Sequence, residues 1–375
     1  MGFRLLPAGQ VLNSTPNSEA PLGGALPSRR TTLRRVLPRS LVSLLIAGGF
    51  AWALSRGGLP LAPPQQTDAS MRWWALPGFM LFLGLAAFLR TARWYYLLRP
   101  LSEKLQRWRV LGMGLLGFSA VFFAPLRLGE VVRPYLLSQD GEVTFVQAVG
   151  SVAAERIIDG LVVALLTAGA FWLSTPITPL PDHIGSLPIP VSLVPGTILF
   201  AALMFSVAFA AMAAFYVARE PAQRLVRAVI GVISPRLAEL CAGTVERLAQ
   251  GFGFLPSWRS SGPFLRDTVL YWGAVSAAQW TLISGVGLEC NLPQAFVTTG
   301  VIALGSLLPA GPGFFGAYQV AAYTSLAMFH PERELLAGGA LFVFYSYATH
   351  VFLNVLVGLA GLMLLSRVPA ASAKA

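Results

Sequence analysis

Long apolar stretches, separated by short basic or proline-rich segments, dominate the hydrophobic pattern of this chain. Several of them approach or exceed the roughly 20 residues that cross a bilayer as a helix. The pattern predicts an all-α polytopic membrane protein with about six transmembrane helices. The predicted spans cover about 40–55, 73–98, 157–173, 193–218, 268–288 and 335–365.

Two further apolar stretches are interrupted by proline, and we predict that each is a re-entrant helical hairpin. In 110–137, Pro125 ends an apolar run and charged residues follow it; in 295–329, the break comes at 309–313. If the first stretch crossed the membrane once, the arginines of 219–266 would lie outside, against the positive-inside rule. The two hairpins then enter from opposite sides. That is the pattern of an inverted repeat whose broken helices meet near the middle of the membrane.

Composition fits a membrane domain, because only 11% of the 375 residues are charged, against about one quarter in soluble domains. Residues 1–35 are rich in Pro, Ser, Asn and Gly and predict a disordered cytoplasmic tail. The integral membrane domain is expected over 36–366, with cytoplasmic interfacial helices over 219–262 and a short tail over 367–375. A long signal peptide is the alternative interpretation of the first span. We expect the inner membrane of a bacterium, with both termini cytoplasmic.

The net charge of +11 is attributed to topology and anionic lipid head groups, not to nucleic acid, because the arginines lie between apolar runs. The cysteines and histidines follow no ligand spacing, so neither a metal nor a cofactor is predicted. No catalytic motif occurs either, and we expect a transporter-like protein rather than an enzyme.

The first polar cluster consists of Arg127, Glu130 and Arg133. These residues step by three, so they would share one broad face of a helix. Charged side chains at membrane depth are costly and usually functional, and guanidinium groups match phosphate in geometry. The cluster therefore predicts a site for an anionic head group. A cytoplasmic loop with ordinary surface pairs is the alternative.

The second cluster, Glu155, Arg156 and Asp159, is expected at the start of the span over 157–173. The two carboxylates are four residues apart and would share a helix face, while Arg156 could pair with Asp159. The acids would balance the arginines of the first cluster or relay a proton. A purely structural lock between the hairpin and the span is the alternative.

Residues 308–319 contain three glycines, which allow the backbone to bend and approach a ligand closely. A helix after the break would direct its N-terminal N–H groups at an anion. The alternative is a kinked span that packs on small residues. On the last span, His350 and Asn354 are four residues apart and favour an interhelical hydrogen bond over a cavity lining.

Over about 38–366 the chain resembles the membrane region of lysylphosphatidylglycerol synthases, also described as flippase-like domain proteins. The resemblance rests on three motifs in order: Arg-x-Gly-Glu, Glu-Arg-x-x-Asp, and Pro-Gly-aromatic-x-Gly-x-aromatic-Glu. The matching residues are Arg127, Gly129, Glu130, Glu155, Arg156, Asp159, Pro312, Gly313, Phe314, Gly316 and Tyr318, with Arg133 shortly after the first motif. Gln319 stands where the third motif ends in Glu. A carboxylate that titrates there in relatives would be absent here or supplied by another acid.

The resemblance implies translocation or handling of an anionic or modified phospholipid, bound by the matched residues together with Gln319. It does not imply lysine transfer, since no aminoacyl-transfer domain is expected in this chain. Two alternatives stay open. One is an intramembrane lipid-phosphate transferase, and the other is a non-catalytic membrane partner of a separate synthase or glycosyltransferase.

Overall fold

The computed structural model describes residues 29–62, 70–124, 129–232, 234–308 and 310–368, with the backbone alone over 29–40. Helices dominate this part of the chain, and its only β-type pairing is an isolated bridge between Ile184 and Leu187. Most of the expected tail over 1–35, and residues 369–375, lie outside the described residues. The helix that contains the first predicted span begins at Arg29, within the stretch that was expected to be disordered.

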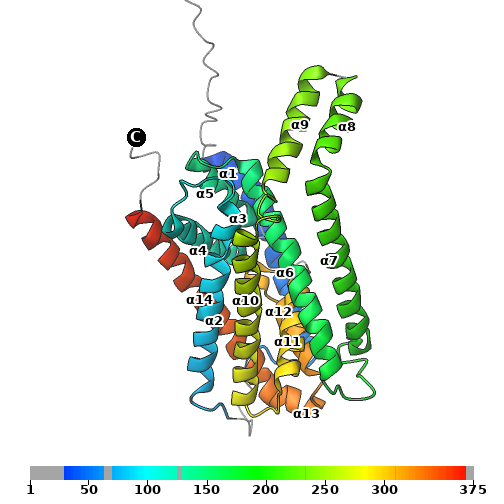
Figure 1. Ribbon diagram of the computed structural model, residues 1–375. Helices are drawn as coiled ribbons and strands as arrows, with labels where there is room; N and C mark the ends of the chain where they lie inside the picture. Colours follow the sequence, from blue (N-terminus) through cyan, green and yellow to red (C-terminus); the bar gives the residue numbers. More distant parts are fainter. Residues whose placement is uncertain (1–28, 63–69, 125–128, 233, 309, 369–375) are drawn as a thin grey trace, which may run out of the picture.

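Long helices run between the two ends of the molecule and alternate in direction (Figure 1). They are α1 (Arg29–Arg56), α2 (Ala75–Ala92) with α3 (Trp94–Leu98), α6 (Phe145–Leu173), α7 (Val194–Val217), α10 (Trp258–Gly285) and α14 (Ala340–Arg367). Four of the described segments are long and apolar enough to cross a membrane, namely Ala75–Leu98, Phe145–Leu173, Val191–Val217 and Glu332–Arg367. The polytopic all-α fold predicted from the sequence is confirmed.

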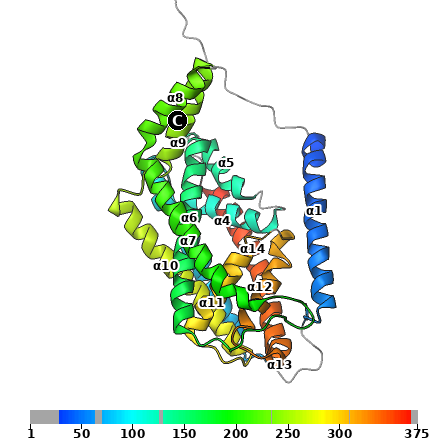
Figure 2. The same cartoon turned by 90° about the vertical axis from the view of Figure 1, so that its right-hand side faces the viewer.

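Two shorter helix pairs enter this bundle from opposite ends and turn back (Figures 1 and 2). The first hairpin consists of α4 (Arg107–Phe123) and α5 (Val132–Gln139), and the second of α11 (Leu292–Gly305) and α12 (Ala317–Leu326). The end of α4 meets the turn of the second hairpin, because the rings of Phe122 and Phe314 lie edge to face with centroids 5.8 Å apart. The two interrupted apolar stretches therefore form the contact that the inverted-repeat pattern predicted.

Helix α6 begins twelve residues before the span that the sequence predicted at 157–173. Thr144 and Gln147 form a capping box: the Thr144 hydroxyl accepts from the Gln147 N–H, and the Gln147 side chain accepts from the Thr144 N–H. As a result, Glu155 and Asp159 lie inside the helix. The prediction that this cluster stands at the start of the span was wrong.

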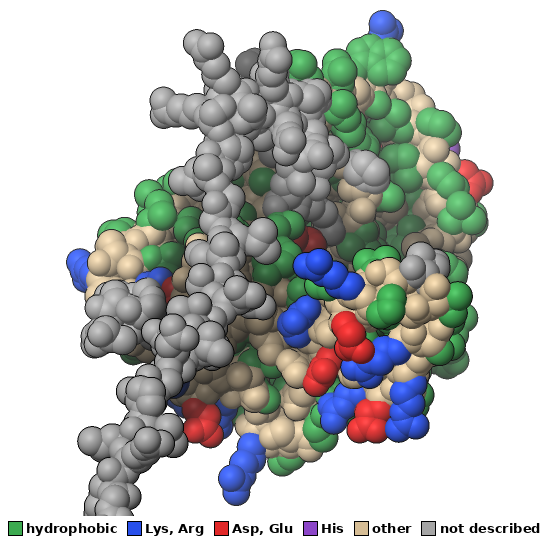
Figure 3. Space-filling view, turned by 90° about the horizontal axis from the view of Figure 1, so that it is seen from above, with side chains coloured by type: hydrophobic (Ala, Val, Ile, Leu, Met, Phe, Trp, Pro, Cys, Tyr) green, Lys and Arg blue, Asp and Glu red, His purple; other side chains and the backbone are tan. Residues whose placement is uncertain are grey.

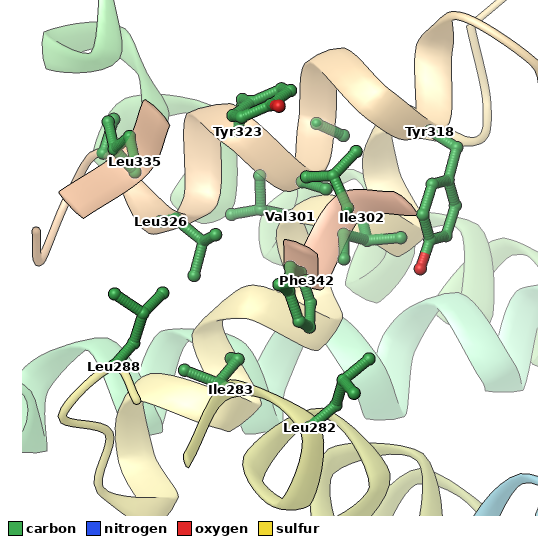
Figure 4. Packing of buried hydrophobic residues seen from close by; sticks show 14 of the residues in the cluster. Leu282, Ile283, Leu288, Val301, Ile302, Tyr318, Tyr323, Leu326, Leu335 and Phe342 are labelled. Carbon is green, nitrogen blue, oxygen red and sulfur yellow. The ribbon is translucent and has the colours of Figure 1, made fainter. Parts of the chain in front are cut away.

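Each hairpin is held by its own apolar cluster. Side chains from α10, α11, α12 and α14 converge around the second hairpin, with Leu282, Ile302 and Phe342 among them (Figure 4). A separate cluster that includes Trp94, Met113 and Phe264 surrounds the first. In lipid such contacts stabilise through close packing rather than through exclusion of water. A third, smaller cluster includes Val163 and Trp272.

Helices α8 (Arg219–Gly231) and α9 (Pro235–Gln250) form an antiparallel pair that extends beyond the bundle in the direction of α7 (Figure 1). Lysine, arginine and acidic side chains gather at this end of the molecule (Figure 3). Arg227 pairs with Glu239 at 3.0 Å, and both side chains are largely exposed. An interfacial position for this pair stays a prediction. It would require the end that carries it to be cytoplasmic.

Candidate functional site

A buried ion pair joins the first hairpin to α6. Nη1 of Arg133, on α5, donates to Oε2 of Glu155 at 2.7 Å, and both side chains have no exposed surface. The guanidinium also lies over the rings of Phe118 and Trp94, at 4.1 and 5.1 Å from their centroids. Arg133 is therefore turned into the protein and neutralised there.

A second buried pair joins the junction of α2 and α3 to α6 and α10. Nη2 of Arg93 donates to Oδ2 of Asp159 at 2.7 Å, and Nη1 donates to the Thr268 hydroxyl at 2.6 Å. Asp159 therefore pairs with an arginine 66 positions away in the chain, not with Arg156 three residues before it, as the sequence suggested. Because Glu155 and Asp159 share one face of α6, this helix supplies the carboxylates for both buried pairs.

Two further arginines of this region have no carboxylate partner within 4.0 Å in the described part of the chain. Arg90 lies over the Phe118 ring at 4.0 Å, and Arg156 lies over the same ring at 5.6 Å. Nε of Arg90, and Nε and Nη2 of Arg156, are buried without a hydrogen-bond partner. Unsatisfied buried donors of this kind are costly. Arg93 and Arg133 also have such donors, but Arg90 and Arg156 lack a carboxylate partner as well, so these two point to a ligand that the described residues do not supply.

Both arginines line a cavity of about 400 Å³ between the two hairpins. Glu130 and Asp159 lie in its wall at the side of the first hairpin, and Phe314 and Tyr318 at the side of the second. Apolar side chains of α6, α7 and α11 complete it, for example Val163, Phe205 and Leu304. The cavity thus combines two guanidinium groups with apolar walls at the centre of the fold.

Two glycines allow the first hairpin to close around this site. A Cβ on Gly129 would come within 2.2 Å of the α4 backbone at Ala120. A Cβ on Gly117 would come within 2.0 Å of Cγ of Arg133. Gly129, which matches the glycine of the Arg-x-Gly-Glu motif, is thus required by close packing rather than by ligand contact. Arg127 and Pro125 lie outside the described residues.

The second hairpin turns through Pro312–Phe314. Gly313 in this turn has a φ of 70°, and Gly316, just before α12, has a φ of 91°. Glycine adopts such angles without steric cost. Phe314 also has a positive φ, 59°, which places its ring against Phe122. A Cβ on Gly316 would meet the Phe50 ring of α1 at 2.2 Å, so α1 packs directly on this turn.

Gln319 acts as a helix cap rather than as a cavity side chain. Its Oε1 accepts from the Gly316 N–H at 2.7 Å, at the first turn of α12, and the residue is buried. Among the matched residues of this hairpin, Phe314 and Tyr318 line the cavity, and the Tyr318 ring lies 5.3 Å from that of His350. Since a carboxylate can accept the same hydrogen bond, Gln319 preserves the cap while it removes the charge.

Gln319→Ala is expected to lower the free energy of unfolding by about 1 kcal/mol, because it leaves the Gly316 N–H without its acceptor. Gln319→Glu keeps an acceptor for the Gly316 N–H, so any loss that it shows reports the cost of a buried carboxylate and not the loss of the cap. Thermal unfolding of the purified variants in detergent would measure the difference. Equal midpoints for Gln319→Ala and wild type would contradict the capping role.

The structure therefore divides the residues predicted for the site. Glu130, Arg156, Asp159 and Tyr318 line the cavity, whereas Arg133 and Glu155 form a buried pair outside its lining. His350 and Asn354 also line it, and their side chains bond to backbone carbonyls of α14 itself, not to another helix as the sequence favoured.

Arg90 and Arg93 were not predicted from the sequence as part of the site. The sequence feature that could have indicated them is the presence of two arginines three positions apart near the end of an apolar span. The Tyr271 ring lies against both of them, but aromatic residues are too common in apolar spans to give such a signal. Among the described residues, no group of three His, Cys, Asp or Glu side chains could hold a metal ion.

The fold and site together define a multi-pass helical membrane protein in which two re-entrant hairpins enclose a cavity lined by arginine. The chain belongs to the family described as the lysylphosphatidylglycerol synthase TM region, whose model matches residues 40–363. This confirms the resemblance found from the motifs, and it makes the chain a membrane protein related to lipid modification or translocation. Comparison with curated proteins and with solved structures gave no match.

Proposed function

We propose that this protein is a lipid translocase that moves an anionic or modified phospholipid across the bacterial inner membrane. One observation carries the proposal: Arg90 and Arg156 line the cavity between the hairpins without a carboxylate partner among the described residues. Buried guanidinium groups need counter-charges, and a phosphate group would supply them with matching geometry. The family also supports a role in lipid handling.

The neighbouring ion pairs would keep this site rigid. Glu155 and Asp159 neutralise Arg133 and Arg93, so these two arginines hold α5, α3 and α10 against α6. Arg90 and Arg156 are left to face the cavity. The proposed substrate contacts are therefore Arg90 and Arg156. Of these two, only Arg156 was among the site residues predicted from the sequence.

The rings of Phe122, at the end of α4, and Phe314 are in edge contact, and both residues line the cavity. Passage of a head group between them would require these two rings to separate. Two aromatic rings in edge contact contribute only about 0.5–1.5 kcal/mol beyond their burial. A gate of this kind could open on the time scale of transport.

Arg90→Ala and Arg156→Ala are each expected to reduce head-group translocation at least about tenfold, since a hydrogen bond to a charged group contributes about 1.5–3 kcal/mol. Proteoliposomes with a fluorescent anionic phospholipid, quenched from outside, would measure the rate. Arg224→Ala, on the exposed pair with Glu220, removes the same side chain remote from the cavity and serves as control.

Unchanged translocation in both cavity variants would contradict the proposal. Formation of a new lipid product by the purified protein, with a donor supplied, would instead favour a lipid-phosphate transferase with Glu130 or Asp159 as base. Absence of transport by the wild type, together with co-purification of a synthase through α8 and α9, would favour the non-catalytic partner.

A further inference from the structure

A second, smaller cavity of about 140 Å³ lies between α2, α4, α10 and α14. It adjoins the arginine-lined cavity, because six residues line both: Arg90, Phe118, Tyr271, Val275, His350 and Asn354. The rest of its lining is nearly all apolar: Leu83, Ala86, Ala87, Thr91, Leu353 and Val357. We call this cavity the α2–α14 slot.

Among the described residues, the slot has one polar side chain beyond those that it shares with the main cavity. This is Thr91, whose hydroxyl donates to the Ala87 and Phe88 carbonyls of its own helix. Two alanines, Ala86 and Ala87, keep the α2 side open. A head group would therefore find no partner there, whereas a hydrocarbon chain would be in contact with apolar atoms throughout.

Exposed apolar side chains are sequence neighbours of slot residues on both α2 and α14. Phe88 on α2 and Phe352 on α14 are each 52% exposed, and Val355 on α14 is 44% exposed. The two helices touch near one end of the slot, where the Phe79 and His350 rings lie 5.9 Å apart, and α14 runs obliquely to α2 (Figure 1). In a membrane-spanning chain these exposed apolar side chains contact lipid, and Phe88 and Phe352 are the direct neighbours of the slot residues Ala87 and Leu353.

We infer that the α2–α14 slot binds one acyl chain of the lipid whose phosphate group is held by Arg90 and Arg156. This inference rests on the proposed function. It adds the place that the acyl chain of the lipid occupies while the head group is bound. Arg90 stands at the junction of the two cavities, with its guanidinium 4.0 Å from the Phe118 ring centroid. A lipid that straddles this junction would place its charge on the arginine and its chain between α2 and α14.

The direct test is photo-crosslinking of the wild-type protein in vesicles that contain phosphatidylglycerol with a diazirine in the middle of one acyl chain. Peptide mapping is expected to find the label on the segments of α2 and α14 that carry Ala87, Leu353 and Val357. Labelling confined to α7 and α11, near Phe205 and Leu304 at the other apolar edge of the main cavity, would overturn the inference. So would the absence of specific labelling.

A variant gives the second measurement. Ala87→Phe should fill the slot and lower both crosslinking to α14 and translocation at least about fivefold, because added atoms in a packed site exclude the ligand. Leu81→Phe, at a position of the same helix that is 70% exposed, should leave both unchanged. Equal crosslinking in the two variants would reject the slot.

The two proposals fail separately. If the wild-type protein moves no lipid but its α2 and α14 segments are still labelled, the slot stands and the translocase is wrong. If the protein moves lipid and the label lies on α7 and α11, the translocase stands and the slot is wrong.

Discussion

Glu155→Ala is expected to lower the free energy of unfolding by about 3–5 kcal/mol, the cost of breaking a buried ion pair by removing one partner. The variant leaves the Arg133 guanidinium charged and fully buried, with no other carboxylate bonded to it among the described residues. Arg93 is affected less, because it keeps its bonds to Asp159 and Thr268. Size-exclusion chromatography after a temperature series would report the loss.

Two controls make this result specific. Glu220→Ala removes a carboxylate that is 72% exposed and pairs with Arg224 at 3.7 Å, and it should cost well under about 1 kcal/mol. The double variant Glu155→Leu with Arg133→Met removes both charges and should recover most of the lost stability, since apolar replacement of a buried pair is often neutral. A double variant as unstable as Glu155→Ala would contradict the ion-pair account.

Gly129→Ala is expected to prevent correct closure of the first hairpin and to cost about 1–3 kcal/mol or more. The added Cβ would lie 2.2 Å from backbone atoms of Ala120 and Val121, which cannot move without displacing α4. We expect lower yields of monodisperse protein and a lower unfolding temperature.

Gly84→Ala in α2 is the matched control, since no neighbouring atom lies within 4 Å of the position that the added Cβ would take. Alanine favours the helix by about 1 kcal/mol relative to glycine, so this variant should be at least as stable as wild type. If Gly129→Ala behaved like Gly84→Ala, the two arms of the hairpin could not be packed as closely as described.

The order of spans and the two hairpins could be predicted from the sequence because they depend on segment length, proline breaks and the distribution of arginine. These signals are local, and a membrane restricts the folds that satisfy them. The contact of Phe122 with Phe314 follows from the two breaks lying at similar depth. The start of α6 could not be predicted the same way, because the charges of Glu155 and Arg156 indicated a position before the span, although Arg133 neutralises Glu155 inside the helix.

The sequence indicated which part of the chain contains the site, but not which individual residues line the cavity. Arg133 and Arg156 both follow from motifs, but nothing local shows that the first is held by Glu155 while the second faces the cavity. Arg93 pairs with Asp159 across 66 positions, and only the packed structure brings them together. Arg90 lies within the predicted span over 73–98, and no motif of the sequence includes it. Its role depends on the rings of Phe118 and Tyr271 beneath it.

At Gln319 the motif suggested a functional role, whereas the structure shows a structural one. The motif suggested that loss of a carboxylate at this position would alter transport. In the structure the side chain caps α12 through the Gly316 N–H, and both Gln and Glu can do this. The difference between the chain and the motif therefore changes a charge next to the site without changing the bond that shapes the turn.

The central claim is that Arg90 and Arg156 hold the phosphate group of a lipid in the cavity between the hairpins. Native mass spectrometry of the protein, purified in mild detergent with added phosphatidylglycerol, tests it most directly. We predict that the wild type and Arg224→Ala retain bound phosphatidylglycerol and that the double variant Arg90→Ala with Arg156→Ala, still folded, loses it. Equal retention by the folded double variant would contradict the account.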